Sequence, residues 1–333
     1  MALKVLRAGV LTTVQDLGRQ GWQRYGVPVG GVMDEMSHRV ANLLVGNAET
    51  EATLEMTIIG ALIEFTEETL FALCGGDFQP TIGRLPVPMA RPVLARAGAV
   101  LDLAQCRLGA RAYLAVAGGF ALPQVLGSKS TYLRGGFGGF EGRALKRGDL
   151  LPTAPRPAGL YPALWDRLAA GAAFVAPKWS VEANTALMAH RHHNIRFVPG
   201  RHWEGFPAEV RERFVSSEYR IAANSDRMGY RLDGPALPFP DAGSLLSEGV
   251  TFGTIQVPPD GKPIVLMANR QTTGGYPRIG EVASVDLPLL AQLPPGDTVR
   301  LSQLALEQSQ ELYLERERQL ALMREAVHMR LRK

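Results

Sequence analysis

The sequence predicts a mainly β protein of barrel or sandwich type, with a few helices and a helix at the C-terminus. Its 333 residues include 36 glycines and 23 prolines, which bound many short runs of alternating apolar and polar residues. Such runs between turn residues are typical of β-strands. Residues 71–103 and 264–301 each give an apolar strand, a polar loop with glycine, a proline-bearing stretch and a second strand. This faint echo favours two similar β units in tandem.

Residues 1–155 are expected to form the first β-barrel region. Turn-rich sequence precedes a helix with Asp34 as its candidate N-cap. Its apolar positions recur at helical spacing, at Met36, Val40, Leu43 and Leu44. Apolar runs at 53–65 and 70–78 predict strands.

The remainder is expected to divide into three parts. Residues 156–193 begin with an alanine- and proline-rich stretch and are interpreted as a connector. Residues 194–302 are expected to form the second barrel, including a hairpin of strands at 251–257 and 263–268. Residues 303–333 carry an apolar stripe within a charged sequence and predict the C-terminal helix.

The hairpin leads into the most polar loop of the chain, which is the first candidate site. Its turn, Pro258-Pro259-Asp260-Gly261, combines prolines that fix φ with a glycine that accepts positive φ. The loop that follows, at 269–276, holds amides, a guanidinium, hydroxyls and two glycines, a set that suits a small polar or anionic ligand. An alternative is a glycine-rich turn whose polar groups satisfy only its own backbone. The candidate residues are Arg270, Gln271, Thr272, Thr273 and Tyr276.

Three other clusters offer groups for anion binding. Residues 127–131 bring a glycine, Lys129 and three hydroxyls including Ser130 into one loop, which suits a phosphate or carboxylate; the alternative is a solvated turn. Residues 224–232 bring Arg227 and a second arginine beside Asp226; the alternative is an ion pair between Asp226 and an arginine. Near the N-terminus, Asp16 offers a carboxylate.

Composition excludes several classes of protein. The 36 basic residues are spread along the chain and nearly balanced by 32 acidic ones, whereas nucleic-acid binding needs a clustered basic face. There is no secretory h-region at the start and no run of about 18 apolar residues, so we expect no secretory signal, no membrane span and a cytoplasmic location. Cys74 and Cys106 lie in apolar, strand-like runs and predict buried thiols.

Recognised nucleotide and metal motifs are missing from the sequence. Neither 127–130 nor the glycine-rich 135–140 has the spacing of a phosphate-binding or dinucleotide-binding loop. The histidines His190, His192 and His193 have no cysteine ligand nearby in the sequence, so a solvated loop is the favoured interpretation and no metal is expected.

Five motifs in register carry a family resemblance. They are VQDLGRQGWQRYGVPVGGVMD, NLLVGN with LEMTIIG, LGSKSTYLRGGFGGFEGRALKRGD, NSDRMGYRLDGP and GTIQVPPDGKPIVLMANRQTTGGYPRIGEV. Together they resemble the second-subunit family of allophanate hydrolase-like proteins. This family includes the C subunit of ATP-dependent 5-oxoprolinases, the antagonist of a sporulation-kinase inhibitor and part of the urea carboxylase carboxyltransferase domain.

The resemblance implies tandem cyclophilin-like β-barrels and a cleft shared with a first-subunit partner that is similar to the B subunit of 5-oxoprolinase. A third protein, similar to its A subunit, would complete the complex. The resemblance also implies that ATP, bound by the complex or by this chain, phosphorylates the lactam oxygen of 5-oxoproline before the ring opens to glutamate.

Residue type, set against the charge that develops in the reactions the resemblance implies, suggests roles for the candidate residues. Arg270, Gln271, Thr272 and Thr273 would be catalytic. Substrate binding would fall to Lys129, Ser130, Arg227, Tyr276 and Asp16. An acidic residue often stands in the family where Asn269 is, and arginine where Lys129 is, so Asn269 cannot act as a base and Lys129 lacks the bidentate fork.

Two alternatives accompany this interpretation. A carboxyltransferase would pass a carboxyl group from biotin to urea and would need a biotin-bearing partner. A regulator would bind a kinase-inhibitor partner and need no catalytic residues. All three involve a partner protein, and both enzymes act on a small amide or lactam, for whose developing charge fixed donors are suited.

Overall fold

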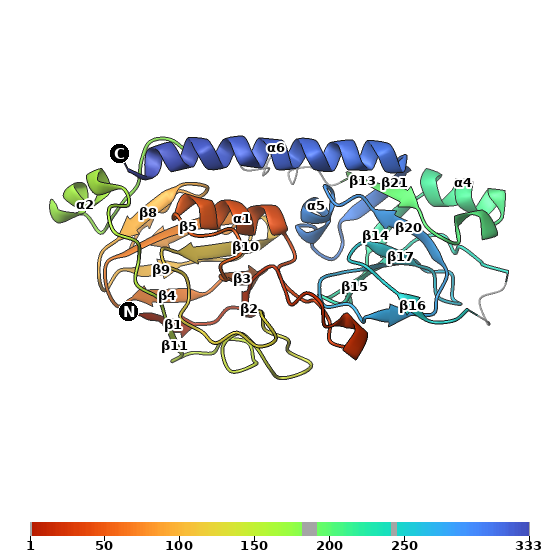
Figure 1. Cartoon of the computed structure of the whole chain (residues 1–333), viewed down its shortest axis with the longest axis horizontal. Coiled ribbons are helices and arrows are strands. Elements are labelled where there is room, and N and C mark those ends of the chain that lie inside the picture. Colours follow the sequence, from red (N-terminus) through yellow and green to blue (C-terminus); the bar gives the residue numbers. More distant parts are fainter. Residues whose placement is uncertain (1, 182–191, 241–244, 333) are drawn as a thin grey trace. The chain divides into compact units, whose positions relative to one another are not determined.

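The computed structural model describes residues 2–181, 192–240 and 245–332, and the chain divides into two compact units (Figure 1). Unit 1 consists of Met1–Arg19, Asp34–Ala189 and Gln319–Lys333. Unit 2 consists of Gln20–Met33 and His190–Arg318. The mainly β prediction is confirmed, and so is the C-terminal helix.

Unit 1 contains two six-stranded sheets. In the first, the order is β11-β1-β4-β9-β6-β7, and in the second it is β12-β8-β5-β10-β3-β2. The strands are β1 (Ala2–Arg7), β2 (Leu11–Gln15), β3 (Thr53–Thr57), β4 (Leu62–Phe65), β5 (Thr69–Asp77), β6 (Thr81–Ile82), β7 (Leu85–Pro86), β8 (Pro92–Ala95), β9 (Val100–Asp102), β10 (Leu108–Val116), β11 (Leu150–Pro152) and β12 (Phe174–Val175).

The inward faces of these sheets form the core of unit 1. Apolar residues alternate along β3 as the sequence pattern predicts, whereas β5 carries the continuous apolar run Leu70–Cys74. Phe65 of β4 stacks on Phe71 of β5 with ring centroids 4.9 Å apart. Helix α1 (Glu35–Leu44) packs on β5 and β10. Asp34 is its N-cap, as predicted, because its carboxylate accepts a hydrogen bond from Ser37 N at 3.0 Å.

Two details of unit 1 differ from the sequence-based expectations. The stretch interpreted as a connector contains α2 (Pro162–Ala169) and β12, which pairs with β8. Cys74 is buried in β5, but Cys106 lies between strands β9 and β10 and is half-buried, so the strand prediction for it is wrong. Its thiol donates to Leu108 O, a local contact that no apolar pattern reveals.

Unit 2 is built on a closed barrel. The strand order is β13-β20-β17-β18-β15-β14-β21, and β13 and β21 pair in parallel. These strands are β13 (His192–Pro199), β14 (Glu218–Ile221), β15 (Gly229–Asp233), β17 (Thr254–Gln256), β18 (Ile264–Leu266), β20 (Arg278–Val282) and β21 (Thr298–Gln303). A separate pair is formed by β16 (Glu248–Gly249) and β19 (Thr273–Gly274).

Helices and aromatic residues complete unit 2. Its helical segments are η1 (Gln23–Tyr25), η2 (Trp203–Gly205), α4 (Ala208–Ser216) and α5 (Leu287–Ala291). The barrel core includes Phe197 and Phe214, whose ring centroids are 5.0 Å apart. Helix α6 (Leu306–Leu331) follows β21; its residues to Arg318 belong to unit 2 and those from Gln319 to unit 1.

Candidate functional site

The predicted hairpin positions the polar loop of unit 2. Strands β17 and β18 pair antiparallel with Ile255 opposite Val265, and Gly261 adopts the positive φ of 74° that its turn requires. After β18 the chain turns tightly, with Arg270 N donating to Met267 O at 3.1 Å. The loop then enters β19, which pairs with β16. The first part of the predicted loop therefore lies between β18, which pairs with β17, and β19, which pairs with β16.

Arg270 is the charged centre of this loop. Its side chain is only 8% exposed, and Nε donates to Val250 O at a long 3.4 Å. Neither Nη nitrogen donates to another residue in the described ranges. Burial lowers the pKa of Arg270 to about 10, and the charge of Glu281 partly opposes this shift. Arg270 is thus a buried cation with donors to spare for an anion or a polarised carbonyl oxygen.

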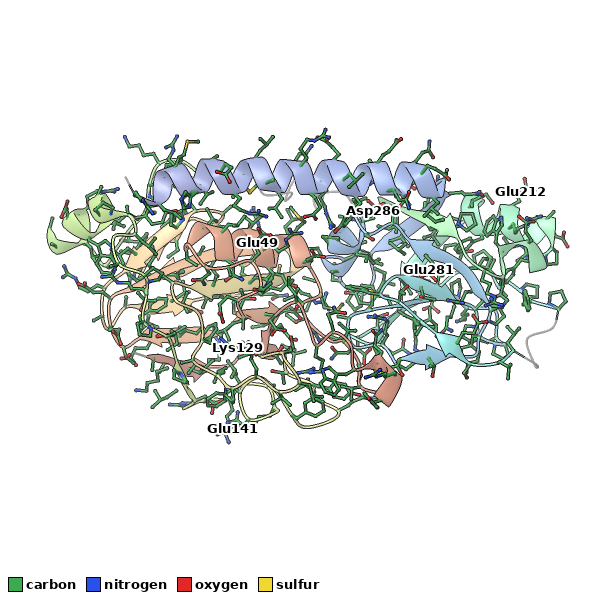
Figure 2. All side chains as sticks on the ribbon, viewed as in Figure 1. Glu49, Lys129, Glu141, Glu212, Glu281 and Asp286 are labelled. Atoms are coloured by element: carbon green, nitrogen blue, oxygen red, sulfur yellow. The ribbon has the colours of Figure 1, made fainter. Side chains whose placement is uncertain are left out.

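Glu281 is the carboxylate that sequence reasoning missed (Figure 2). It lies on β20, and its Oε2 accepts hydrogen bonds from Thr251 Oγ1 at 2.9 Å and Thr254 Oγ1 at 2.8 Å. Burial raises its pKa, while the two hydroxyls and the charges of Arg278 and Arg270 act in the opposite direction. A half-buried carboxyl with a raised pKa is suited to accept and return a proton.

The amide side chains beside Arg270 form a short hydrogen-bonded row. Gln271 Nε2 donates to Gln256 Oε1, and Gln256 Nε2 donates to Tyr276 O, each at 3.5 Å. A Cβ on Gly274 would lie 2.4 Å from Gln256 Nε2, so a larger residue there would displace the Gln256 amide. Since Arg270 and Gln271 contact residues outside the loop, a turn that satisfies only its own backbone does not describe them.

The other predicted residues of this loop are more open. Thr273 is exposed and pairs with Gly249 through the backbone. Thr272 is half-buried, and its carbonyl accepts from Val250 N at 3.1 Å. Tyr276 is 44% exposed. These residues follow Arg270 in the loop and are more exposed than it is.

Arg227 lies beside the start of the same loop. Its Nη2 donates to Gly31 O and, at 3.4 Å, to Asn269 Oδ1, while Asn269 N donates to Arg227 O at 2.7 Å. Asp226 instead accepts from the backbone amides of Met228 and Gly229. In the described part of the chain Asp226 makes no ion pair, so that alternative is wrong: its carboxylate closes a turn.

In unit 1, the loop at 127–131 surrounds Asp16. Asp16 Oδ1 accepts from Ser128 Oγ and Ser130 Oγ, each at 2.6 Å, and from Gly18 N at 2.8 Å. Its Oδ2 accepts from Lys129 N at 2.6 Å. Both serine side chains are fully buried, which contradicts the alternative of a solvated turn. The loop does hold a carboxylate, and that carboxylate is the protein's own.

Lys129, labelled in Figure 2, also has its hydrogen-bond donors engaged by other residues of unit 1. Its Nζ donates to Glu51 Oε1 at 2.5 Å and to Phe120 O at 2.8 Å. Glu51 lies far away in the sequence, and nothing in its local pattern indicates this contact. The charge of Lys129 is therefore balanced within unit 1, and the lysine is less available to an anion than the sequence suggests.

The structure describes only part of the histidine cluster at 190–193. His193 lies on β13 and is 4% exposed, so the solvated-loop interpretation does not describe it. His190 and the side chain of His192 lie outside the described residues. Across the described ranges there is no group of three histidine, cysteine or acidic side chains able to hold a metal ion. The same ranges include no helix long and apolar enough to cross a membrane.

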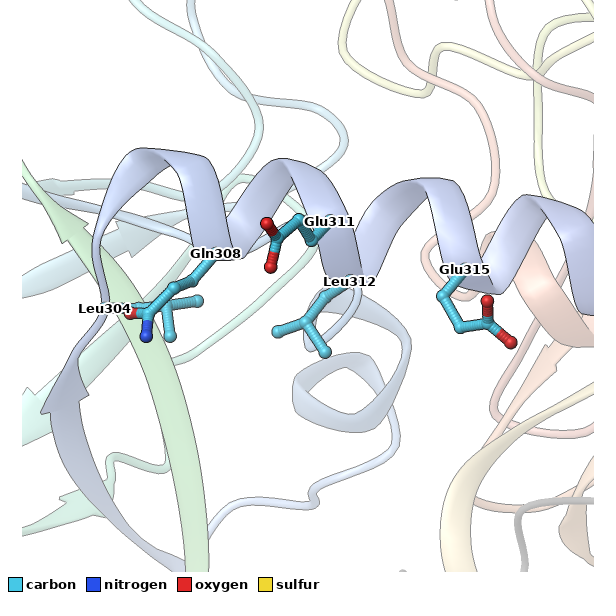
Figure 3. Close-up of a pocket in the computed structure, with 5 residues that line it drawn as sticks. All are labelled: Leu304, Gln308, Glu311, Leu312 and Glu315. Atoms are coloured by element: carbon cyan, nitrogen blue, oxygen red, sulfur yellow. The ribbon is translucent and has the colours of Figure 1, made fainter.

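A pocket of about 410 Å³ lies against the first turns of α6 (Figure 3). Its described lining includes two acidic side chains and no basic one, and it shares no residue with the predicted sites. The lining residues are Leu304, Gln308, Glu311, Leu312 and Glu315.

Comparisons with known proteins agree on one family. A model of the carboxyltransferase domain, subdomain A and B, matches residues 25–303. The chain is 36% identical to the C subunit of 5-oxoprolinase from Haemophilus influenzae, covering 90% of this chain and 90% of the relative. It is 38% identical to the C subunit of 5-oxoprolinase from Escherichia coli, covering 92% and 93%. The Kluyveromyces lactis urea carboxylase structure superposes with a TM-score of 0.83 at 29% identity, covering 95% of this chain but only 28% of that protein.

Proposed function

The chain belongs to the carboxyltransferase domain family of subdomains A and B, and from this premise we propose that it is the C subunit of an ATP-dependent 5-oxoprolinase. The observation that carries the proposal is that the match covers nearly all of this chain and nearly all of each relative. The chain spans 90% and 93% of two relatives with that name, whereas it spans only 28% of the urea carboxylase structure. We propose that it acts as an amide (lactam) hydrolase in the cytoplasm, together with the A and B subunits.

The Arg270 loop is our candidate for the reacting centre. Addition of a water oxygen to the lactam carbon places negative charge on the carbonyl oxygen; when that intermediate collapses, the C–N bond breaks and the nitrogen takes up a proton. The Nη groups of Arg270, which bind no other described residue, are suited to stabilise that charge in a largely buried site. Glu281 is suited to take the proton of the attacking water and return it to the leaving nitrogen.

The remaining predicted residues are assigned supporting parts in this proposal. Gln271 is placed to orient the amide through the row that runs to Gln256. Arg227 positions the start of the loop through Asn269, which is an amide and cannot serve as a base. The residues that border the site are Thr272, Thr273 and Tyr276.

The cluster in unit 1 receives a different part. Asp16, Lys129 and Ser130 are bonded to one another and to neighbouring residues of unit 1. We assign them a structural role there.

The loop at 127–131 does not fit the phosphates of ATP. The loop with a glycine, a lysine and hydroxyls at 127–131 directs its serines to Asp16 and its lysine to Glu51. We therefore propose that ATP is bound elsewhere in the complex.

The proposal is tested by ATP-dependent release of glutamate from 5-oxoproline by this chain purified with its A and B companions. Release that requires this chain, and is lost in a folded Arg270→Ala complex, supports it. Arg220→Ala is the matched control, because Arg220 is exposed on β14 of the same barrel. A fully assembled complex without turnover would contradict the proposal.

A carboxyltransferase is the second candidate, favoured by the superposition on urea carboxylase over 95% of this chain. That reaction would need carboxybiotin on a partner protein. Transfer of radiolabelled carboxyl from a biotinylated carrier to urea, dependent on this chain, would establish it in place of the first.

A further inference from the structure

Arg19 of unit 1 is a buried cation with unused hydrogen-bond donors. Its side chain is 1% exposed, and Nη2 donates to Ser130 O. Nε and Nη1 are buried, and neither has a hydrogen-bond partner among the described residues. Buried guanidinium N–H groups without an acceptor are strongly unfavourable, because they lose water and gain nothing in exchange. An acceptor is therefore expected where these two nitrogens point.

The nearest acidic group does not supply that acceptor. Asp16 contributes favourable electrostatics to Arg19, whose bond within the described ranges goes to Ser130 O instead. The Asp16 carboxylate already accepts from two serine hydroxyls and two backbone amides. The other charged pair of the cluster, Lys129 and Glu51, is bonded to itself. Among the described residues, the guanidinium is left without a carboxylate of its own.

A glycine-rich segment covers one face of the same guanidinium. Phe137 places its ring 5.0 Å from Arg19 Cζ. A Cβ on Gly138 would lie 2.7 Å from Nη2 and 2.2 Å from Ser130 O, so the backbone passes directly over the guanidinium group. The covering segment packs on the guanidinium from the side of Nη2 and leaves Nε and Nη1 as the unpartnered donors.

We propose that Arg19 binds a small monoanionic carboxylate, either of a small molecule or of a companion's side chain. A carboxylate supplies the planar oxygen acceptors that a guanidinium binds best. A single negative charge suits a position close to Asp16, where a dianion such as phosphate would meet repulsion. This site is distinct in composition from the Arg270 loop and does not depend on the proposed function.

The test is the thermal unfolding midpoint of the purified chain titrated with sodium acetate, against sodium chloride at equal ionic strength. We expect acetate to raise the midpoint of the unaltered chain. In Arg19→Gln the apparent affinity for acetate should be at least about tenfold weaker. Arg134→Gln is the matched control, since Arg134 is exposed just before the glycine-rich segment. An equal rise with chloride, no rise at all, or a rise unchanged in Arg19→Gln overturns the proposal.

Two further measurements keep the proposal testable if Arg19→Gln does not fold. In a crystal structure of the unaltered chain grown with acetate, a carboxylate within hydrogen-bond distance of Nε or Nη1 supports the site, and water alone there overturns it. The source of the carboxylate is distinguished by repeating the titration on the assembled complex. Loss of the acetate effect there indicates a companion's side chain, and its persistence indicates a small molecule.

Discussion

The Asp16 cluster of unit 1 and the Arg270 loop of unit 2 are built from similar residue types but differ in how their charges are satisfied. Asp16 accepts four hydrogen bonds, and Lys129 is paired with Glu51. Arg270 and Glu281 are both partly desolvated. Burial lowers the pKa of Arg270 and raises that of Glu281, so that in each case it favours the neutral form. A polar cluster whose bonds are all internal stabilises a fold, whereas unsatisfied charge is available for a ligand.

The strongest test of the contrast is Asp16→Ala. It removes the acceptor from Ser128, Ser130 and two amides in a buried loop, so we expect the free energy of unfolding to fall by about 3–5 kcal/mol. Urea denaturation of the purified chain measures this loss. Asp16→Asn keeps one carbonyl acceptor and should lose clearly less. A stability unchanged in Asp16→Ala would show that the cluster is not structural.

Arg270→Ala should behave in the opposite way. We expect turnover of the assembled complex to fall by about 100- to 1000-fold, the usual effect of removing a donor to a developing negative charge. Stability should change little, because the Arg270 side chain makes a single long hydrogen bond within the described ranges. Steady-state glutamate release and urea denaturation of the same preparation separate the two effects. A variant that loses stability and keeps its turnover would reverse the contrast.

Acid should act on unit 1 through His38. It is fully buried beside Thr53, and burial lowers its pKa from 6.5 to about 4. Between about pH 6.5 and about pH 4, His38 therefore binds a proton in the unfolded chain but not in the folded chain. We expect the free energy of unfolding to fall by about 3 kcal/mol as the pH is lowered through this range. Unfolding of His38→Gln, measured across this range, should show a shallower decline. An identical decline would mean that His38 is not its source.

Glu281 should give unit 2 a smaller response of opposite sign. Because its folded pKa is raised, its contribution to stability is complete below the pKa of 4.5 for an ordinary glutamate and is lost as pH rises through the folded pKa. Glu281→Gln cannot ionise, so its stability relative to the parent chain should increase with pH over that window. Paired denaturation curves measure the difference. A difference that does not vary with pH would argue against a desolvated carboxyl.

The smallest expected effect is that of Glu51→Gln. The ion pair with Lys129 is partly exposed, with 17% and 26% side-chain exposure, so solvent screens it. We expect a loss of roughly 1 kcal/mol in urea denaturation that shrinks at high salt. Glu64→Gln, which breaks the more exposed pair with Lys4, is the matched comparison and should lose less. Equal losses would show that the pair of Lys129 and Glu51 contributes no more to stability than an exposed ion pair does.

Local features of this protein could be predicted from sequence because they depend on neighbouring residues. The cap at Asp34, the turn at Gly261 and the C-terminal helix follow from side-chain hydrogen bonding, backbone freedom and periodicity. The polar loop around Arg270 was visible for the same reason.

Features that depend on distant residues could not be predicted. Glu281 becomes notable only through Thr251 and Thr254, which barrel closure brings to it. Glu51 lies 78 residues before Lys129 and meets it only through the tertiary fold. Arg19 lies within a recognised motif, yet only its burial distinguishes it from an ordinary surface arginine.

The division of the chain has a consequence for its ancestry and its engineering. The backbone passes from one unit to the other at 19/20, 33/34, 189/190 and 318/319, so neither unit is a continuous stretch of sequence. No single cut yields either unit whole, and no exchange of halves between relatives can transplant one of them intact. A chimera that exchanges one unit whole must therefore be joined at all four crossings.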